Sequence, residues 1–307
     1  MTSRRLEGAV AVVTGAGNGL GRASARRLSE EGASVVVVDI NGDTAEQVSA
    51  GLAGPSIAVH ADISTEDGVQ SYVDAALAEF GRIDLHHLNA GIFGGFDALP
   101  DLSVDDFEKV MGVNVRGQFL GLRAAFRQYR DQGSTGAIVV TASIASLTGS
   151  ADLLPYVTSK HAVVGLIHGA AMYGGPLGIR VNGVAPGIVP TDLFAAAAST
   201  SGGKNDMEQR ASTTPLRRAG TAEEIAAVAA FLLSDDASYV TGQIVSADGG
   251  ATIVNTVRPS GGAGAWNTDR VDQALYGDQW NTQRGIPQSS TPQGSTPQST
   301  HEKGTAR

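Results

Sequence analysis

The chain has 307 residues, a length that fits one α/β domain with an extension. Hydrophobic residues make up 42% of it, and the formal net charge of -9 argues against a nucleic-acid partner, which requires a basic surface. The absence of cysteine excludes disulfides and thiolate metal sites. No apolar run approaches the ~18 residues of a membrane span. We therefore expect a soluble, cytoplasmic protein that binds neither nucleic acid nor membrane.

Short apolar runs alternate with longer amphipathic stretches along most of the chain. Continuous hydrophobicity within a run predicts a strand buried on both faces, as in a parallel sheet. The alternation therefore predicts an α/β fold, with a doubly wound sheet of mainly parallel strands and helices on both faces. The seven expected strands are 10–13, 34–39, 57–60, 85–88, 137–141, 179–184 and 243–247, and the expected helices are 19–31, 44–52, 65–80, 104–129, 155–173 and 221–233.

The alternation stops near Ile253, which divides the chain into three parts. We interpret residues 1–254 as a single catalytic domain. Residues 255–280 carry apolar anchors such as Trp266 and Trp280, which predict an extension that docks on the protein. Residues 281–307 are rich in Ser, Thr, Pro and Gln and have almost no apolar side chain, so we expect a disordered tail.

A glycine-rich turn follows the first expected strand and opens a helix. Its sequence is Thr14-Gly15-Ala16-Gly17-Asn18-Gly19-Leu20-Gly21. Glycines let backbone N–H groups approach a pyrophosphate, and the helix N-terminus favours its negative charge. Because the turn has a strand before it and a helix after it, the pattern predicts a dinucleotide site.

Asp39 ends the second expected strand, where a carboxylate can accept hydrogen bonds from the adenosine ribose hydroxyls and repels a 2′-phosphate. Asn18 is neutral and no basic residue directly follows Asp39, so the pattern favours NAD over NADP. The alternative is that Asp39 only caps the next turn. Asp62 and Asn89-Ala90-Gly91 follow the third and fourth strands and could bound the adenine pocket, but capping of the helix near Thr65 explains Asp62 equally well.

Tyr156 and Lys160 are four residues apart at the start of an expected helix, so both lie on one face. A free tyrosine has a pKa near 10, and a nearby ammonium together with oxidised nicotinamide would lower it. Tyr156 could then take the alcohol proton or supply it in reduction. Ser143 could hold the substrate oxygen, with Ser146 as a competing candidate. Asn114 interrupts an apolar helical stretch and could position a water that connects Lys160 to solvent.

These motifs, with Pro186-Gly187 and Asp248-Gly249-Gly250, resemble the short-chain dehydrogenase/reductase family over roughly residues 5–253. The resemblance implies a Rossmann-type fold, NAD(P) binding and an Asn–Ser–Tyr–Lys catalytic set. It also implies that Lys160 binds the nicotinamide ribose and that Val189 and Thr191 contact the carboxamide. A homotetramer built partly through the helix of Tyr156 is usual in the family, with a homodimer as the alternative. Leu88 departs from the family pattern, which often has a second Asn there.

The candidate site residues form three groups. The expected catalytic residues are Asn114, Ser143, Tyr156 and Lys160. The expected cofactor-binding residues are Gly15, Gly17, Asn18, Gly19, Leu20, Gly21, Asp39, Ile40, Asp62, Ile63, Asn89, Ala90, Gly91, Tyr156, Lys160, Pro186, Gly187, Val189 and Thr191. The expected substrate pocket consists of Phe93, Ile144, Leu147, Leu153, Leu154, Leu193 and Phe194.

The expected pocket wall is apolar, and Lys160 is the only basic residue expected there. This predicts an uncharged secondary alcohol or ketone, cyclic or aromatic, although several of these side chains could simply be core. The segment 193–215 is interpreted as a mobile lid. His86 and His87 are adjacent on a strand and point to opposite faces, so no metal site is expected.

We therefore expect an NAD-dependent alcohol dehydrogenase or ketone reductase that uses Tyr156 as general acid and base. The alternative enzyme is an NADPH-dependent biosynthetic ketoreductase. The alternative from another class is a non-catalytic dinucleotide sensor or scaffold.

Overall fold

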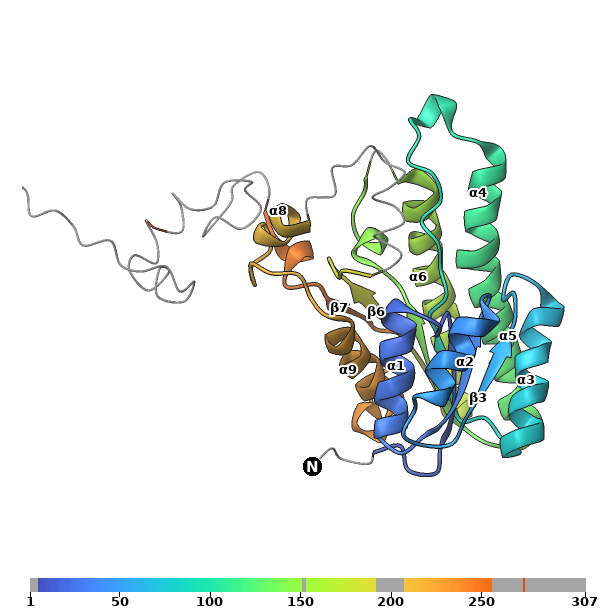
Figure 1. The fold of residues 1–307 in the computed structure, drawn as a ribbon. Helices are drawn as coiled ribbons and strands as arrows, with labels where there is room; N and C mark the ends of the chain where they lie inside the picture. Colours follow the sequence, from blue (N-terminus) through green and yellow to red (C-terminus); the bar gives the residue numbers. More distant parts are fainter. Residues whose placement is uncertain (1–4, 151–152, 192–206, 256–272, 274–307) are drawn as a thin grey trace, which may run out of the picture.

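A computed structural model of the chain describes residues 5–150, 153–191, 207–255 and 273. Within them, seven parallel strands form one sheet in the order β3-β2-β1-β4-β5-β6-β7 (Figure 1). The predicted Rossmann-type sheet is therefore confirmed. The strands are β1 (Val10–Thr14), β2 (Ser34–Asp39), β3 (Ser56–His60), β4 (Leu85–Leu88), β5 (Gly136–Thr141), β6 (Ile179–Pro186) and β7 (Ile244–Ala247).

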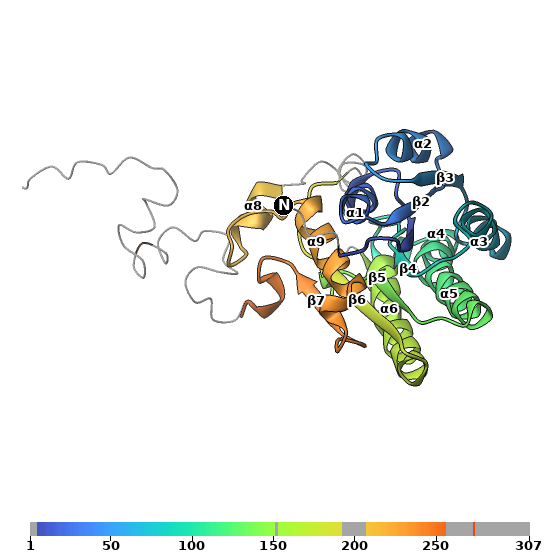
Figure 2. The same ribbon diagram turned by 90° about the horizontal axis from the view of Figure 1, so that it is seen from below.

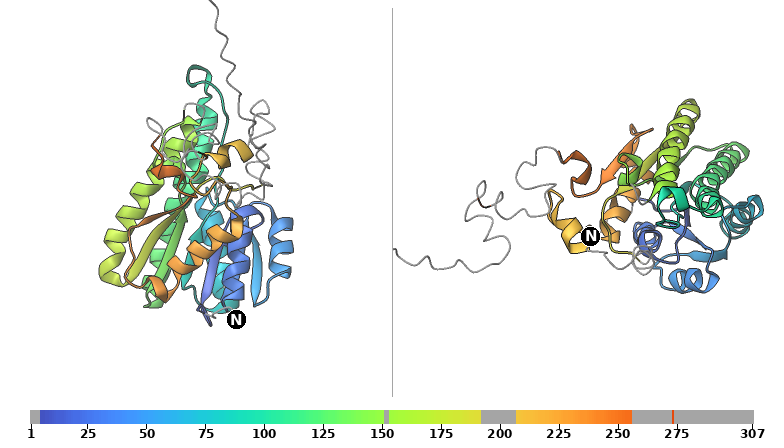
Figure 3. Two further views of the ribbon diagram at one scale, coloured as in Figure 1. Left: turned by 90° about the vertical axis from the view of Figure 1, so that its left-hand side faces the viewer. Right: turned by 90° about the horizontal axis from the view of Figure 1, so that it is seen from above.

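Helices cover both faces of the sheet (Figure 2). Helices α1, α2 and α9 pack on one face, and α3, α5 and α6 pack on the other. Figure 3 shows α1 and α9 side by side on the first face. The helices are α1 (Gly19–Glu30), α2 (Gly42–Ala50), α3 (Glu66–Phe80), α4 (Val104–Met111), α5 (Gln118–Gln132), α6 (Leu154–Gly174), α8 (Met207–Ser212) and α9 (Ala222–Leu233).

The valine run of β2 explains why the strand sequence is apolar without interruption. Val35 and Val37 belong to the core under α1 and α9, whereas Val36 and Val38 belong to the core under α3. Successive strand side chains point to opposite faces, and here both faces are covered. Each buried valine contributes ~1.5–3 kcal/mol relative to an exposed one.

The expected helix 104–129 is not one regular helix. The segment Gly112–Gly117 between α4 and α5 forms a π-helical turn that contains the buried Asn114. A π turn accommodates one extra residue, and such turns occur frequently at functional sites. The periodicity of the sequence does not reveal this insertion, because the turn keeps the helix direction.

Two parts of the sequence-based domain division lie outside the described residues. These are nearly all of the expected docking extension and the whole of the expected tail. Of the expected lid, residues 193–206 are also outside, whereas its later part contains α8. No helix in the described part of the chain is long and apolar enough to cross a membrane.

Strand β4 places two histidines in the protein interior. His86 Nδ1 lies 2.9 Å from the Tyr129 hydroxyl, and His87 Nε2 lies 3.0 Å from the Thr141 hydroxyl. The other nitrogen of each ring is buried without a hydrogen-bond partner among the described residues. Burial lowers the pKa of His86 to about 3 and that of His87 to about 4. Both rings are therefore neutral at pH 7.

We expect the free energy of unfolding to fall as the pH is lowered from 7 to 5. In the unfolded chain both histidines take up a proton near pH 6.5, whereas in the folded chain they stay neutral until about pH 4. The unfolded state therefore binds more protons in this window, which costs ~2 kcal/mol of stability per histidine at pH 5. Urea unfolding at both pH values measures the difference.

Variants of each histidine show whether this loss of stability comes from the two buried rings. His86→Gln and His87→Gln should each weaken the pH dependence. The exposed His161→Gln is the matched control and should leave it unchanged. The same pH dependence in all three variants would contradict this account.

Candidate active site

The glycines at the turn between β1 and α1 stand where a side chain would not fit. Gly15 has a left-handed φ of +64°, and a Cβ there would lie 2.8 Å from the Ala90 Cα. A Cβ on Gly21 would collide with the Gly15 carbonyl oxygen. Helix α1 begins at Gly19, so its unpaired N–H groups face the turn. The turn is therefore a cradle in which backbone N–H groups could meet a pyrophosphate, and its residues fit a dinucleotide.

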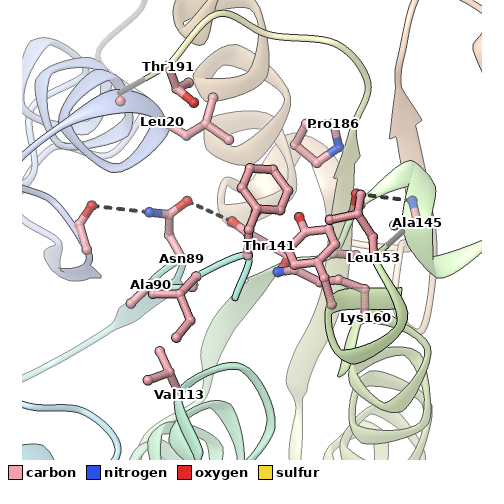
Figure 4. Close-up of a pocket in the computed structure, with 18 of the residues that line it drawn as sticks. Leu20, Asn89, Ala90, Val113, Thr141, Ala145, Leu153, Lys160, Pro186 and Thr191 are labelled. Atoms are coloured by element: carbon pink, nitrogen blue, oxygen red, sulfur yellow. Dashed lines mark hydrogen bonds between the residues drawn. The ribbon is translucent and has the colours of Figure 1, made fainter. Parts of the chain in front are cut away.

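A cavity of about 1260 Å³ opens at the carboxyl ends of the strands (Figure 4). Two of the expected cofactor residues, Gly17 and Gly21, do not line it. Gly17 leaves room for the Asp39 carboxylate, and Gly21 leaves room for the Gly15 carbonyl. The remaining expected cofactor residues line it, namely Gly15, Asn18, Gly19, Leu20, Asp39, Ile40, Asp62, Ile63, Asn89, Ala90, Gly91, Tyr156, Lys160, Pro186, Gly187, Val189 and Thr191.

Asp39 holds the glycine turn as well as lining the cavity. Its Oδ2 accepts a hydrogen bond from the Gly17 N–H at 2.8 Å, and its Oδ1 accepts one from the Asn41 N–H at 2.9 Å. The second bond is the capping contact that the alternative interpretation expects. An ionised carboxylate has about four acceptor positions, so both bonds leave acceptor capacity for ribose hydroxyls.

Asp62 lines the cavity and is not the N-cap of α3. That position belongs to Thr65, whose hydroxyl accepts the Gly68 N–H at 3.0 Å. The Asp62 carboxylate instead accepts the Ser64 N–H at 2.9 Å. Asp62 therefore shapes the loop after β3 at the rim of the cavity.

Tyr156 lies in the first turns of α6, with its ring among Phe93, Ser143 and Lys160. The Tyr156 hydroxyl shares a hydrogen bond with the Ser143 side chain. The Lys160 ammonium lies 5.6 Å from the centre of the Tyr156 ring. Ser146 does not line the cavity, because its hydroxyl accepts the Ser143 N–H at 3.2 Å. Of the two serines, only Ser143 can therefore reach a substrate here.

Burial raises the pKa of Tyr156 to about 12, although the hydrogen bond with Ser143 opposes this rise. Burial also lowers the pKa of Lys160 to about 8. The expected lowering of the Tyr156 pKa involves both the lysine and oxidised nicotinamide, and it stays a prediction for the protein with cofactor bound. Loss of hydration has the larger effect at both groups.

A chain of hydrogen bonds joins three strand ends at the site (Figure 4). The Asn89 amide donates to the Thr14 and Gly15 carbonyls at 3.1 and 3.3 Å, and its oxygen accepts the Thr141 hydroxyl at 3.0 Å. Because that hydroxyl donates to Asn89, it must accept from His87, which fixes the proton of this ring on Nε2. Lys160 Nζ donates to the Thr141 carbonyl at 2.8 Å.

Asn114 is fully buried and does not line the cavity. Its Oδ1 accepts the Ile92 N–H and its Nδ2 donates to the Ile92 carbonyl, both at 2.8 Å. The same Nδ2 donates to Ser159 at 3.0 Å, and Ser159 donates to the Tyr156 carbonyl at 2.7 Å. The π turn thus links the loop after β4 to the helix that carries Tyr156.

The expected substrate pocket is only partly assembled from the expected residues. Phe93, Ile144 and Leu153 line the cavity. Leu147 and Leu154 do not line it and are 48% and 37% exposed, so their assignment to the pocket is corrected. Their apolar character does not determine the direction of the side chain. Leu193 and Phe194 lie outside the described residues.

Several residues that line the cavity carry no signal in the sequence. Phe96 lies with its ring centre 6.2 Å from that of Phe93 and adds to an aromatic wall. Lys109, Arg116 and Arg210 also line the cavity, which includes the expected cofactor site as well as the expected substrate pocket. None of them belongs to a motif, and only the folded chain brings them to the cavity.

The fold and the arrangement of Ser143, Tyr156 and Lys160 define a nicotinamide dinucleotide-dependent oxidoreductase that acts on alcohols or ketones. A family model described as Enoyl-(Acyl carrier protein) reductase matches residues 15–252. The chain belongs to the short-chain dehydrogenase/reductase family.

Named relatives and solved structures agree with this assignment. Levodione reductase from Leifsonia aquatica is 40% identical over 249 residues, which are 78% of this chain and 93% of that protein. A crystal structure of levodione reductase matches with a TM-score of 0.78 at 39% identity, covering 82% of this chain and 100% of that one. Cyclohexanol dehydrogenase from Acinetobacter sp. (strain SE19) is 37% identical over 81% of this chain and 97% of that protein. A structure of NAD+-bound xylitol dehydrogenase matches with a TM-score of 0.75 at 35% identity, covering 80% of this chain and 100% of that one.

We expect Tyr156→Phe to lower kcat by ~10²–10⁴-fold, because general acid–base catalysis contributes about that much. The dissociation constant for NADH, followed by fluorescence, should change little. Tyr239→Phe, at a fully exposed tyrosine, is the matched control and should keep the wild-type rate. Turnover of Tyr156→Phe near the wild-type level would show that the phenol is not the proton-transfer group.

Proposed function

We propose that this protein is an NAD-dependent dehydrogenase or ketone reductase for uncharged cyclic secondary alcohols. The observation that carries the proposal is the aromatic wall beside the proton-transfer group. The Phe93 ring centre lies 4.5 Å from that of Tyr156 at an interplanar angle of 52°. Flat apolar surfaces of this kind suit a saturated or aromatic ring. Levodione reductase and cyclohexanol dehydrogenase, by their names, act on ring compounds.

In the proposed mechanism Ser143 and Tyr156 hold the substrate oxygen between their hydroxyls. When bound, the nicotinamide supplies the hydride acceptor or donor and, in its oxidised form, a positive charge. Tyr156 takes the alcohol proton in oxidation and returns it in reduction. Lys160, anchored on the Thr141 carbonyl, keeps its ammonium beside the phenol and favours the phenolate once the proton has left.

The proposed cofactor is NAD, because the Asp39 carboxylate lines the cavity at the end of β2. The proposed cofactor residues are those that line the cavity around the glycine turn, Asp39 and Asp62, with Lys160 at the nicotinamide ribose. A 2′-phosphate near Asp39 would meet a like charge, which costs affinity. The runner-up is an NADPH-dependent ketoreductase, and the basic side chain of Arg116 in the same cavity is the observation in its favour.

A comparison of alcohols and of cofactors tests the proposed function. We expect kcat/KM for cyclohexanol to exceed that for propan-2-ol by about tenfold or more, because even one additional methylene buried in an apolar pocket is worth about tenfold or more. We expect the same preference for NAD+ over NADP+. Initial rates of NADH or NADPH formation measure both ratios. A preference for propan-2-ol would contradict the proposed substrate class, and a preference for NADP+ would contradict the proposed cofactor.

We also propose that the protein is a homotetramer that buries one end of α6. Met172 and Tyr173 are 81% and 69% exposed at the end of this helix, and Leu177 follows in the next turn with 51% exposure. Exposed apolar patches of this kind occur at contacts between copies of a chain. The same helix carries Tyr156 at its other end.

Light scattering with size-exclusion chromatography should give the mass of four chains. The double variant Met172→Glu/Tyr173→Glu should reduce the mass to that of a dimer or a monomer, because the two unpaired charges would be costly to bury in the contact. Val104→Glu, at an apolar residue of α4 that is also exposed, is the control and should leave the mass unchanged. A double variant with the wild-type mass would contradict the proposed contact.

A further inference from the structure

The segment 92–95 in the loop that follows β4 is held by hydrogen bonds at both ends. At its start, both backbone polar groups of Ile92 bond to the Asn114 side chain. Three residues later the Gly95 N–H donates to Asp106 Oδ2 at 2.7 Å. Asp106 lies in the first turn of α4, where Ser103 caps the helix by accepting the Asp106 N–H. The loop is therefore held at one end by an amide and at the other by a carboxylate.

The backbone of this loop lies directly against α4. Gly94 has a left-handed φ of +79°, and a Cβ there would collide with Val110 and lie 2.9 Å from Asp106 Oδ2. A Cβ on Gly95 would lie 3.2 Å from the same oxygen. Two glycines are thus what allows the carboxylate to reach the backbone. They also make the loop flexible when it is unfastened, because glycine has the largest conformational freedom.

The aromatic wall of the cavity lies on the segment 92–95 and on the residue that directly follows it. Phe93 is 8% exposed and its ring lies against Tyr156, with Phe96 immediately after the second fastening. Both phenylalanines line the cavity. Asp106 itself does not line the cavity. Asp106 can therefore affect a substrate only indirectly, and its hydrogen bond to the Gly95 N–H connects it to this loop.

We propose that Asp106 is a positioning residue for substrate specificity, which acts through the Gly95 N–H to hold Phe93 and Phe96 against ring-shaped substrates. This inference rests on the proposed function. A hydrogen bond to a charged carboxylate is shorter and stronger than one between neutral groups. The N-terminus of α4 favours the negative charge on Asp106 and therefore favours this stronger bond. Without it the Gly94–Gly95 backbone has no fixed position on α4, and the wall loses its fixed distance from Tyr156.

Three variants separate this role from a general effect of charge or stability. Asp106→Ala removes the acceptor. Asp106→Asn keeps an oxygen that can accept the Gly95 N–H. Asp105→Ala removes a neighbouring, exposed acid from the same first turn of α4 and is the matched control for the charge at the helix N-terminus.

We expect Asp106→Ala to raise KM for cyclohexanol about tenfold, the effect of losing one charge-assisted hydrogen bond. KM for propan-2-ol should change much less, because a small acyclic alcohol makes little use of the wall. The dissociation constant for NADH should stay unchanged. Asp106→Asn should restore most of the wild-type KM, and Asp105→Ala should match the wild type. Equal changes for both alcohols, or the same effect in Asp105→Ala, would overturn the proposal.

Hydrogen exchange of the Gly95 amide tests the fastening without any substrate. Exchange should be faster in Asp106→Ala than in the wild type, and unchanged in Asp105→Ala. Unchanged exchange in Asp106→Ala would overturn the inference even if the wild type prefers cyclohexanol. If instead the wild type oxidises no cyclic alcohol, the proposed function and the specificity claim for rings both fail, and the exchange result still reports on the fastening itself.

Discussion

The amide of Asn89 is the interaction on which the geometry of the site depends. It bonds to the end of β1 through Thr14 and Gly15 and to the end of β5 through Thr141, so one side chain fixes three neighbouring strand ends. Strand ends have no ladder partner beyond the last pair, and an unpaired buried polar group would cost free energy. The Thr141 carbonyl in turn accepts a hydrogen bond from the Lys160 ammonium. The cofactor cradle and the proton-transfer group are therefore held in one frame.

The replacement of the usual polar residue by Leu88 is compatible with this frame because the space around it is apolar. Leu88 is almost fully buried in the core formed by α5 and α6. A Cβ on Gly121 would lie 2.7 Å from the Leu88 Cδ2, so the glycine is what admits the larger side chain. The neighbouring His87 points to the opposite face of the sheet, where its Nε2 bonds to the Thr141 hydroxyl.

The sequence predicted the sheet and the central site because local signals agree with the tertiary structure there. The valines of β2 are apolar at every position because both faces are buried, and the spacing of Tyr156 and Lys160 requires only one helical face. The π turn at Asn114 gave no such signal, since one inserted residue changes neither composition nor helix direction. The side chains of Leu147 and Leu154 turn toward the surface, and this direction cannot be predicted from the residue type. Phe96 reaches the cavity only through its loop.

Burial changes the pKa values of both Tyr156 and Lys160 in the protein without cofactor. With a pKa of about 12, the Tyr156 phenol keeps its proton at neutral pH, and with a pKa of about 8 Lys160 is mostly charged. Reduction requires a protonated phenol beside Ser143, because the phenol must donate its proton to the ketone oxygen as the hydride is added. Oxidation requires the phenolate, and the ammonium of Lys160 does not by itself offset the loss of hydration around the ring. When bound, oxidised nicotinamide would add a second positive charge to that of Lys160 and so favour the phenolate.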